Sequence, residues 1–314
     1  MLLAKRSVRS LLRFQPAIEI LEGRSLMSAG ITIVGHEMDI TAGTPGSTIS
    51  VTDNGAGAVS AWMKTGSQTI SQVGQGISKV VIHGGDGNDI IYFQDSGVLK
   101  SALELDIDTG AGSDHEYLNF QRGISGAPVA LNLAAGSGAD SVDLSFGNIQ
   151  NSKVNVKANL HSSSDIFSSV VFYGLSGNSM LNYNIQGNGM ADRVVLNFMG
   201  KIDSAASINV VDQNTPTAND RLSIRYRGEL DGNLNIDVQQ AAAWYGVQSQ
   251  FTLDPLSMGT IKVQLSDAWN EYDSSLVVTD HSGGAIVSII DPLEEVLTSP
   301  TGTQVIAKAP KPLV

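Results

Sequence analysis

Cysteine is absent from this 314-residue sequence, which excludes disulfide bonds, cysteine-ligated zinc, iron–sulfur clusters and thiol catalysis. Long apolar runs are absent as well, since no stretch reaches the roughly 18 residues that a membrane-spanning helix requires. The sequence does contain 42% apolar residues, enough for a sizeable core, together with 33 glycines. Because glycine destabilises helices, this composition disfavours a helical bundle and predicts a turn-rich β protein.

Charge is divided unevenly along the chain. The formal net charge is −12, but residues 1–30 hold five basic and two acidic side chains and carry +3, so the remainder carries −15. A basic head before an acidic body is typical of a targeting segment followed by a mature domain. A body of this charge repels phosphate backbones and anionic membrane surfaces, so we do not expect nucleic acid as a partner. Divalent cations are the more natural partner.

The basic head carries a family resemblance. Within the segment from Phe14 to Ser28, Leu21-Glu22 is followed by Arg24 and Leu26. This segment resembles the LEPR-XLL segment at the start of many large bacterial exported proteins, and it departs from that pattern at Gly23 and Met27. The resemblance implies secretion or surface association ahead of β-rich repeats. The alternative is an amphipathic N-terminal helix that belongs to the fold.

A repeat of about 26 residues organises the body. The string from Gly84 to Tyr92 fits every fixed position of the nonapeptide G-G-x-G-x-D-x-U-x, in which U is a large aliphatic residue. Weaker copies follow, and their aspartates recur at spacings of 25, 26, 25, 27 and 28 residues. The six aspartates are Asp89, Asp114, Asp140, Asp165, Asp192 and Asp220.

Apolar residues follow each turn in the order that the repeat predicts. If a strand leaves each turn with alternate residues buried, the second, fourth and sixth positions after each aspartate should be apolar. Fifteen of these eighteen positions are apolar, against about eight expected from composition. The exceptions are Asp95, Glu116 and Ser169. The sixth positions would form an internal ladder of Phe120, Phe146, Val171, Phe198 and Tyr226.

These patterns predict an all-β fold, a parallel β-helix or β-solenoid with coils of about 26 residues and capping strands. We expect a basic export segment at residues 1–30 and N-terminal capping strands with a hairpin at 31–78. Solenoid repeats should occupy 79–285, with a C-terminal cap and flexible tail at 286–314. A sandwich of hairpins is the competing architecture, and it would place successive strands antiparallel.

The Gly/Asp turns resemble those of the repeats-in-toxin family, in which turns of adjacent coils hold Ca²⁺ between them. Carboxylates and backbone carbonyls are the hard oxygen ligands that Ca²⁺ prefers, and glycine lets the backbone curve around an ion. The family has turns on both sides of a shorter coil, whereas this chain has one such turn in each repeat. The resemblance implies metal ligands at Asp86, Asp89, Asp114 and Asp140, with Gly85 and Gly87 as carbonyl donors.

A purely structural role is the alternative for these turns. An aspartate can stabilise a turn by accepting backbone N–H bonds, and we favour this role for Asp165, Asp192 and Asp220.

Signals for catalysis are weak. The five histidines lie far apart, and the chain has no H-E-x-x-H, G-x-S-x-G or P-loop motif. Glu104, Asp106 and Asp108 should share the outer face of one strand, close to Asp114 and Glu116. Parallel β-helix lyases and glycoside hydrolases use outward acidic clusters with basic partners. A solvated acidic face explains this group more simply.

The sequence therefore predicts an exported bacterial β-solenoid with a structural or adhesive role, secreted or on the cell surface, with cell-surface or extracellular polymers as partners and Ca²⁺ as a stabilising ion. We do not expect an enzyme. The alternative, a carbohydrate-active β-helix enzyme (a polysaccharide lyase or glycoside hydrolase), would show a groove that combines carboxylates with Lys or Arg.

Overall fold

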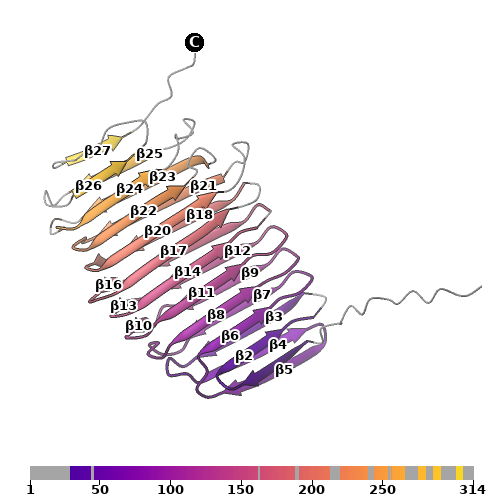
Figure 1. Cartoon of the computed structure of the whole chain (residues 1–314). Coiled ribbons are helices and arrows are strands. Elements are labelled where there is room, and N and C mark those ends of the chain that lie inside the picture. Colours follow the sequence, from indigo (N-terminus) through magenta and orange to yellow (C-terminus); the bar gives the residue numbers. More distant parts are fainter. Residues whose placement is uncertain are drawn as a thin grey trace, which may run out of the picture.

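The computed structural model describes residues 29–43, 46–161, 163–187, 191–212, 220–239, 244–253, 255, 257–265, 275–280, 286–290 and 302–306. Every regular element in these ranges is a β-strand, and the strands stack coil upon coil around a shared interior (Figure 1). Strands of successive coils pair in parallel, as β11 (Val129–Ala134) does with β8 (Leu103–Asp108). The predicted parallel β-solenoid is confirmed, and the alternative of a hairpin sandwich is wrong.

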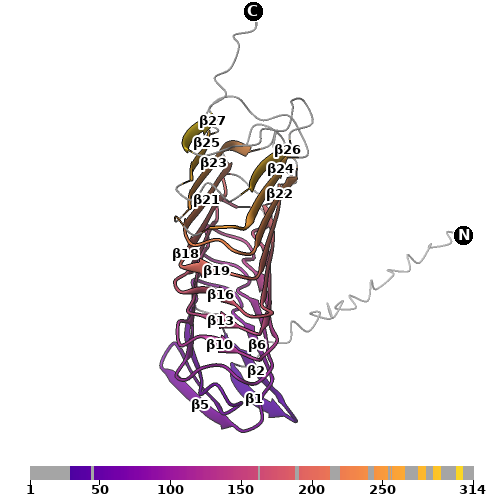
Figure 2. The same ribbon diagram turned by 90° about the vertical axis from the view of Figure 1, so that its left-hand side faces the viewer.

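Two long sheets and one short sheet form the walls of the solenoid, as Figure 2 shows from the side. Besides β8 and β11, the first sheet contains β1 (Gly30–Val34), β2 (Glu37–Thr41), β6 (Lys79–His83), β14 (Lys153–Asn159), β17 (Met180–Gly187), β20 (Ala205–Asp212), β22 (Asn233–Gln239), β24 (Thr260–Leu265) and β26 (Ile286–Ile290).

The second sheet contains β3 (Ser47–Asp53), β4 (Val59–Thr65), β5 (Gln68–Gly74), β7 (Ile90–Asp95), β9 (His115–Phe120), β12 (Ser141–Phe146), β15 (Ile166–Val171), β18 (Arg193–Met199), β21 (Asp220–Gly228), β23 (Trp244–Leu253), β25 (Ser275–Asp280) and β27 (Gly302–Ile306). The short third sheet contains β10 (Ile124–Ser125), β13 (Ile149–Gln150), β16 (Gly174–Ser176) and β19 (Lys201–Ile202).

The interior is built from rows of equivalent residues in neighbouring coils. Phe120 pairs in register with Phe146, which in turn pairs with Val171, and the row continues through Phe198 to Tyr226. All five are buried, so the predicted ladder is confirmed. The ring centroids of Phe120 and Phe146 lie 5.5 Å apart, which is close to the spacing of adjacent strands. Each coil therefore buries its apolar row against the coils on either side.

The ends of the solenoid differ from its middle. At the N-terminal end, β1 pairs antiparallel with β2, and β3, β4 and β5 form an antiparallel meander. This includes the hairpin expected within residues 31–78. The parallel stack begins earlier than residue 79, because β2 and β3 already pair in parallel with β6 and β7.

At the C-terminal end, β27 pairs antiparallel with β25. It lies within residues 286–314, where we expected a cap and a flexible tail, and it is a regular strand. The expected export segment lies outside the described residues as far as residue 28, and so does the tail from residue 307 onward.

Candidate functional site

The Gly/Asp turns place their aspartates inside the solenoid. Asp89, Asp114 and Asp140 are each at most 4% exposed. Asp89 donates its backbone N–H to Oδ1 of Asp114 at 2.7 Å, and Asp114 donates in the same way to Asp140 at 2.8 Å. The row extends through Asp165 to Asp192 with bonds of 2.8 and 3.0 Å. Each carboxylate in this aspartate row thus stabilises the turn of the preceding coil.

Asp165 and Asp192 therefore have the acceptor role that we favoured for them. The side chain of Asp220 lies outside the described residues.

Asp89, Asp140 and Asp165 of the aspartate row hold their protons more tightly than exposed carboxyls do. Burial raises the pKa of Asp89 to about 7 and that of Asp140 to about 7, although each carboxylate accepts a backbone N–H that favours the charged form. Burial likewise raises the pKa of Asp165 to about 6. In these three residues Oδ2 is buried without a hydrogen-bond partner among the described residues. A neutral carboxyl tolerates that environment better than a carboxylate does.

Glu116 adds a second acidic group to the interior. It stands between Ile91 and Val142 in a row of the second sheet and is 2% exposed. Burial raises its pKa well above the ordinary value, and the nearby Asp140, Asp114 and Asp108 raise it further. Its Oε2 has no hydrogen-bond partner within the described part of the chain.

Glycine is required in the turns because neighbouring coils approach closely there. Gly87 has φ +105° and Gly112 has φ +144°, conformations that other residues rarely adopt. A Cβ built on Gly112 would lie 2.3 Å from the carbonyl oxygen of Gly87. The carbonyl of Gly85 accepts the N–H of Ala111, which lies in the turn of the next coil, at 2.8 Å. The turns are thus held together by their own backbones.

The residues that the resemblance implies as calcium ligands are divided between two environments. Asp86 is exposed at the turn, whereas Asp89, Asp114 and Asp140 point inward and accept backbone N–H groups. Among the described residues no group of three or more acidic or histidine side chains is arranged to hold a metal ion. This arrangement fits backbone acceptors better than a calcium cage, and calcium binding stays a prediction.

The acidic cluster that we expected on an outer face is partly assembled. Lys79 on β6 binds Glu104 and Asp106 on β8, with distances of 3.0 and 2.8 Å from Nζ. Although its partial burial would raise the pKa of Asp106, hydrogen bonds from Asn132 and Lys79 bring it below the ordinary value. Asp114 and Glu116 lie in the interior, and they do not join this outer group.

Next to these residues, the outer face of the first sheet carries a groove of about 400 Å³. Its lining includes Asp106, Asp108 and Lys157 as well as the amides of Asn132, Asn184 and Gln186.

A group of arginines on the second sheet was not predicted from the sequence. Five arginines follow residue 30, and four of them lie exposed on two adjacent strands of the second sheet. These are Arg193 on β18 and Arg221, Arg225 and Arg227 on β21. The sequence does contain a sign of this group. In residues 221–227 arginines alternate with apolar residues, and in a strand this pattern places the arginines together on the outer face.

Two of the arginines line a cavity of about 620 Å³, which we call the arginine pocket. It lies on the outer side of the second sheet and is lined by Arg225, Arg227, Asn197, Gln250, Phe172 and Met199, among others. Among the described residues Arg225 and Arg227 form no ion pair.

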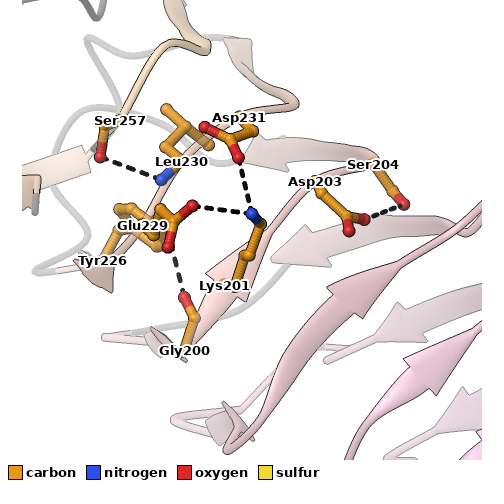
Figure 3. A network of polar contacts seen from close by, with 9 residues as sticks. All are labelled: Gly200, Lys201, Asp203, Ser204, Tyr226, Glu229, Leu230, Asp231 and Ser257. Atoms are coloured by element: carbon orange, nitrogen blue, oxygen red, sulfur yellow. Dashed lines mark hydrogen bonds and ion pairs between the residues drawn. The ribbon is translucent and has the colours of Figure 1, made fainter.

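An ion-pair network lies close to this pocket in the structure. Figure 3 shows Lys201 between Glu229 and Asp231, each 2.7 Å from its Nζ. In the same view, the hydroxyl of Tyr226 donates to the carbonyl oxygen of Gly200 at 3.3 Å. Lys201 thus pairs with both carboxylates that follow β21, and the pKa of Asp231 is lowered by its bond to Lys201.

Comparisons with known proteins give no relative: no family model, no curated protein and no solved structure matches this chain. Within the described residues, no helix is long and apolar enough to cross a membrane.

Proposed function

We propose that this chain is an exported bacterial β-solenoid with a structural or adhesive role at the cell surface or outside the cell. The observation that carries the proposal is the uninterrupted parallel stack with antiparallel strands at both ends. A stack of this kind aligns the equivalent outer positions of successive coils in rows, so it provides an extended surface on which a partner can be bound. The basic head and its resemblance to the LEPR-XLL segment support export.

The end strands support the same role. An unprotected parallel edge is a template for uncontrolled pairing with other chains. Here β1 covers one edge of the first sheet, while β5 and β27 are the outermost strands of the second sheet. Because β1, β5 and β27 all pair antiparallel with their neighbours, they interrupt the parallel register at these edges. The fourth outer strand, β26 of the first sheet, pairs in parallel with β24, so within the described residues three of the four edges of the long sheets are interrupted in this way.

The proposal is tested by locating the protein in its native host. Cells are fractionated, and intact cells are treated with a protease to which the membrane is impermeable. We expect the chain in the surface or extracellular fraction and degraded by the external protease. A chain that is confined to the cytoplasmic fraction, with a cytoplasmic marker as control, would refute export.

A carbohydrate-active enzyme is the second candidate, and the groove of the first sheet favours it. Asp106 is a carboxylate of lowered pKa beside Asp108 and Lys157, which is the combination of acidic and basic groups that such an enzyme requires. The test is release of reducing ends or unsaturated products from acidic and neutral polysaccharides. The enzyme would be established if Asp108→Asn abolished this activity and Asp143→Asn, a control on the other long sheet, retained it. If none of the polysaccharides yields product, the enzyme candidate is refuted.

Calcium binding at the turns has a direct test of its own. Calorimetric titration with millimolar Ca²⁺ should show saturable heat if the turns hold the ion, and Asp86→Asn with Asp89→Asn should reduce it. Absence of heat would assign the aspartate row to turn stabilisation alone.

A further inference from the structure

We propose that the arginine pocket binds the carboxylate groups of an acidic polysaccharide of the uronate class. The inference rests on the adhesive role proposed above and names the chemistry of the partner. It begins from a contrast in charge: a body that carries −15 after residue 30 concentrates four of its five arginines on β18 and β21.

Arg225 and Arg227 supply the charge for this interaction. They are two residues apart on one strand, so their side chains leave the same face about 7 Å apart. Both are exposed and neither forms an ion pair among the described residues. The carboxylates of Glu229 and Asp231, which follow on the chain, are already bound by Lys201. The guanidinium groups are therefore available for a ligand carboxylate, which arginine binds in bidentate geometry.

The residues beside the arginines suit the uncharged parts of a uronate sugar, its hydroxyls and its ring C–H groups. Asn197 and Gln250 are the register neighbours of Arg225 on β18 and β23. Their amides offer both donors and acceptors, as sugar hydroxyls require. Phe172 and Met199 add apolar surface against which the C–H groups of a sugar ring can pack. A cavity of about 620 Å³ is within the range of ordinary ligand sites.

The overall charge favours a uronate polymer over a nucleic acid. Duplex DNA carries one negative charge about every 1.7 Å along its axis, and this high density is repelled by a strongly acidic body. A uronate polymer has one carboxylate on each sugar, and the uncharged hydroxyls between them suit Asn197 and Gln250. The ligand that we propose therefore combines sparse negative charge with many hydroxyls.

The experiment measures binding of the full chain to polygalacturonate by titration calorimetry, with dextran and duplex DNA as comparison probes. The test variant is Arg225→Gln/Arg227→Gln. The matched control is Lys64→Gln/Lys153→Gln, which removes two exposed positive charges that line neither the arginine pocket nor the groove of the first sheet. We expect polygalacturonate to bind, dextran and DNA to bind more weakly, and the arginine variant to lose about tenfold or more in affinity. The lysine control should stay within about twofold of the parent.

The inference would be overturned if the chain did not bind polygalacturonate or bound DNA more tightly. Equal losses of affinity in the two double variants would also overturn it, since they would show a general charge effect. Circular dichroism spectra of the variants establish that the solenoid is retained. If the chain is found at the cell surface but does not bind polygalacturonate, only this inference is refuted and the proposed function stands. Cytoplasmic location with intact binding refutes the proposed function alone.

Discussion

Asp114 donates its backbone N–H to Oδ1 of Asp140, the equivalent residue of the next coil, at 2.8 Å. The same bond recurs along the aspartate row, so one side chain in each coil fixes the turn of the coil before it. The most regular signal in the sequence thus has a structural explanation in the contact between successive turns.

Removing one of these acceptors should destabilise the fold. Asp140→Ala leaves the buried N–H of Asp114 without a partner, and we expect it to lower the free energy of unfolding by about 1–3 kcal/mol. Asp140→Asn keeps an acceptor oxygen and should cost less. Asp143→Ala, on the exposed face of β12, should stay within about 0.5 kcal/mol of the parent. Urea denaturation checks all three, and equal effects of Asp140→Ala and Asp143→Ala would contradict the role of the row.

The aspartate row should make the protein more stable in mild acid than at neutral pH. Asp89 and Asp140 have a pKa of about 7 when folded, and an ordinary value near 3.8 when unfolded. Between these values the folded chain binds more protons than the unfolded chain, so the free energy of unfolding falls as pH rises from about 4 to 7. The neutralisation of surface carboxylates, which reduces the negative charge of the body, acts in the same direction.

Urea midpoints measured from pH 4.5 to 7.5 test this dependence. The double variant Asp89→Asn/Asp140→Asn should flatten it. Midpoints that rise with pH in the parent would show that the row is charged in the folded state.

Glu116 should be a point at which the chain can be stabilised. Its carboxyl interrupts an apolar row between Ile91 and Val142, so Glu116→Leu replaces a buried acid with a side chain that suits the row. We expect a higher thermal midpoint at pH 7.5, where unfolding releases the proton of Glu116, and a smaller gain at pH 4.5. Glu116→Gln should lie between the parent and the leucine variant at pH 7.5. A lower midpoint for Glu116→Leu at both pH values would show that the carboxyl is required for packing.

Two glycines of the turns distinguish two costs of a substitution by alanine: the strain of a positive φ angle and the steric clash between neighbouring coils. Gly138 and Gly126 both have positive φ, +127° and +70°. A Cβ on Gly138 would lie 1.6 Å from the carbonyl oxygen of Gly112, whereas nothing lies within 4 Å of one on Gly126. Gly126→Ala should therefore cost only about 1–2 kcal/mol. Gly138→Ala should cost clearly more in thermal or urea unfolding, and equal costs would mean that the coils can separate at the turn without penalty.

Much of the fold could be predicted from the sequence, because the same local pattern recurs in every coil. The spacing of the aspartates and the apolar second, fourth and sixth positions specify the register that pairs Phe120 with Phe146. The start of the parallel stack at β2 and β3 could not be read in this way, because residues 31–78 lack the Gly/Asp turn. Strand β27 was missed because prolines surround its short sequence.

The functional surfaces were harder to predict than the repeat. The inward direction of Asp89 follows from the alternation that buries Ile91, but the resemblance to calcium-binding turns suggested a ligand instead. The arginine pocket depends on Asn197, Arg225 and Gln250, which lie 25 to 28 residues apart and meet only through strand register. Such a group is recognised once the coils are aligned and not from any single segment.

The in-register stacking of the coils has a consequence for how such a chain can change length. A whole repeat of about 26 residues can be added or removed without altering the contacts inside the other coils, because each coil touches only its neighbours. One residue inserted within a strand would instead turn every following side chain of that strand to the opposite face. The rod can therefore grow or shrink by whole coils, while the interior of each strand has a fixed residue count.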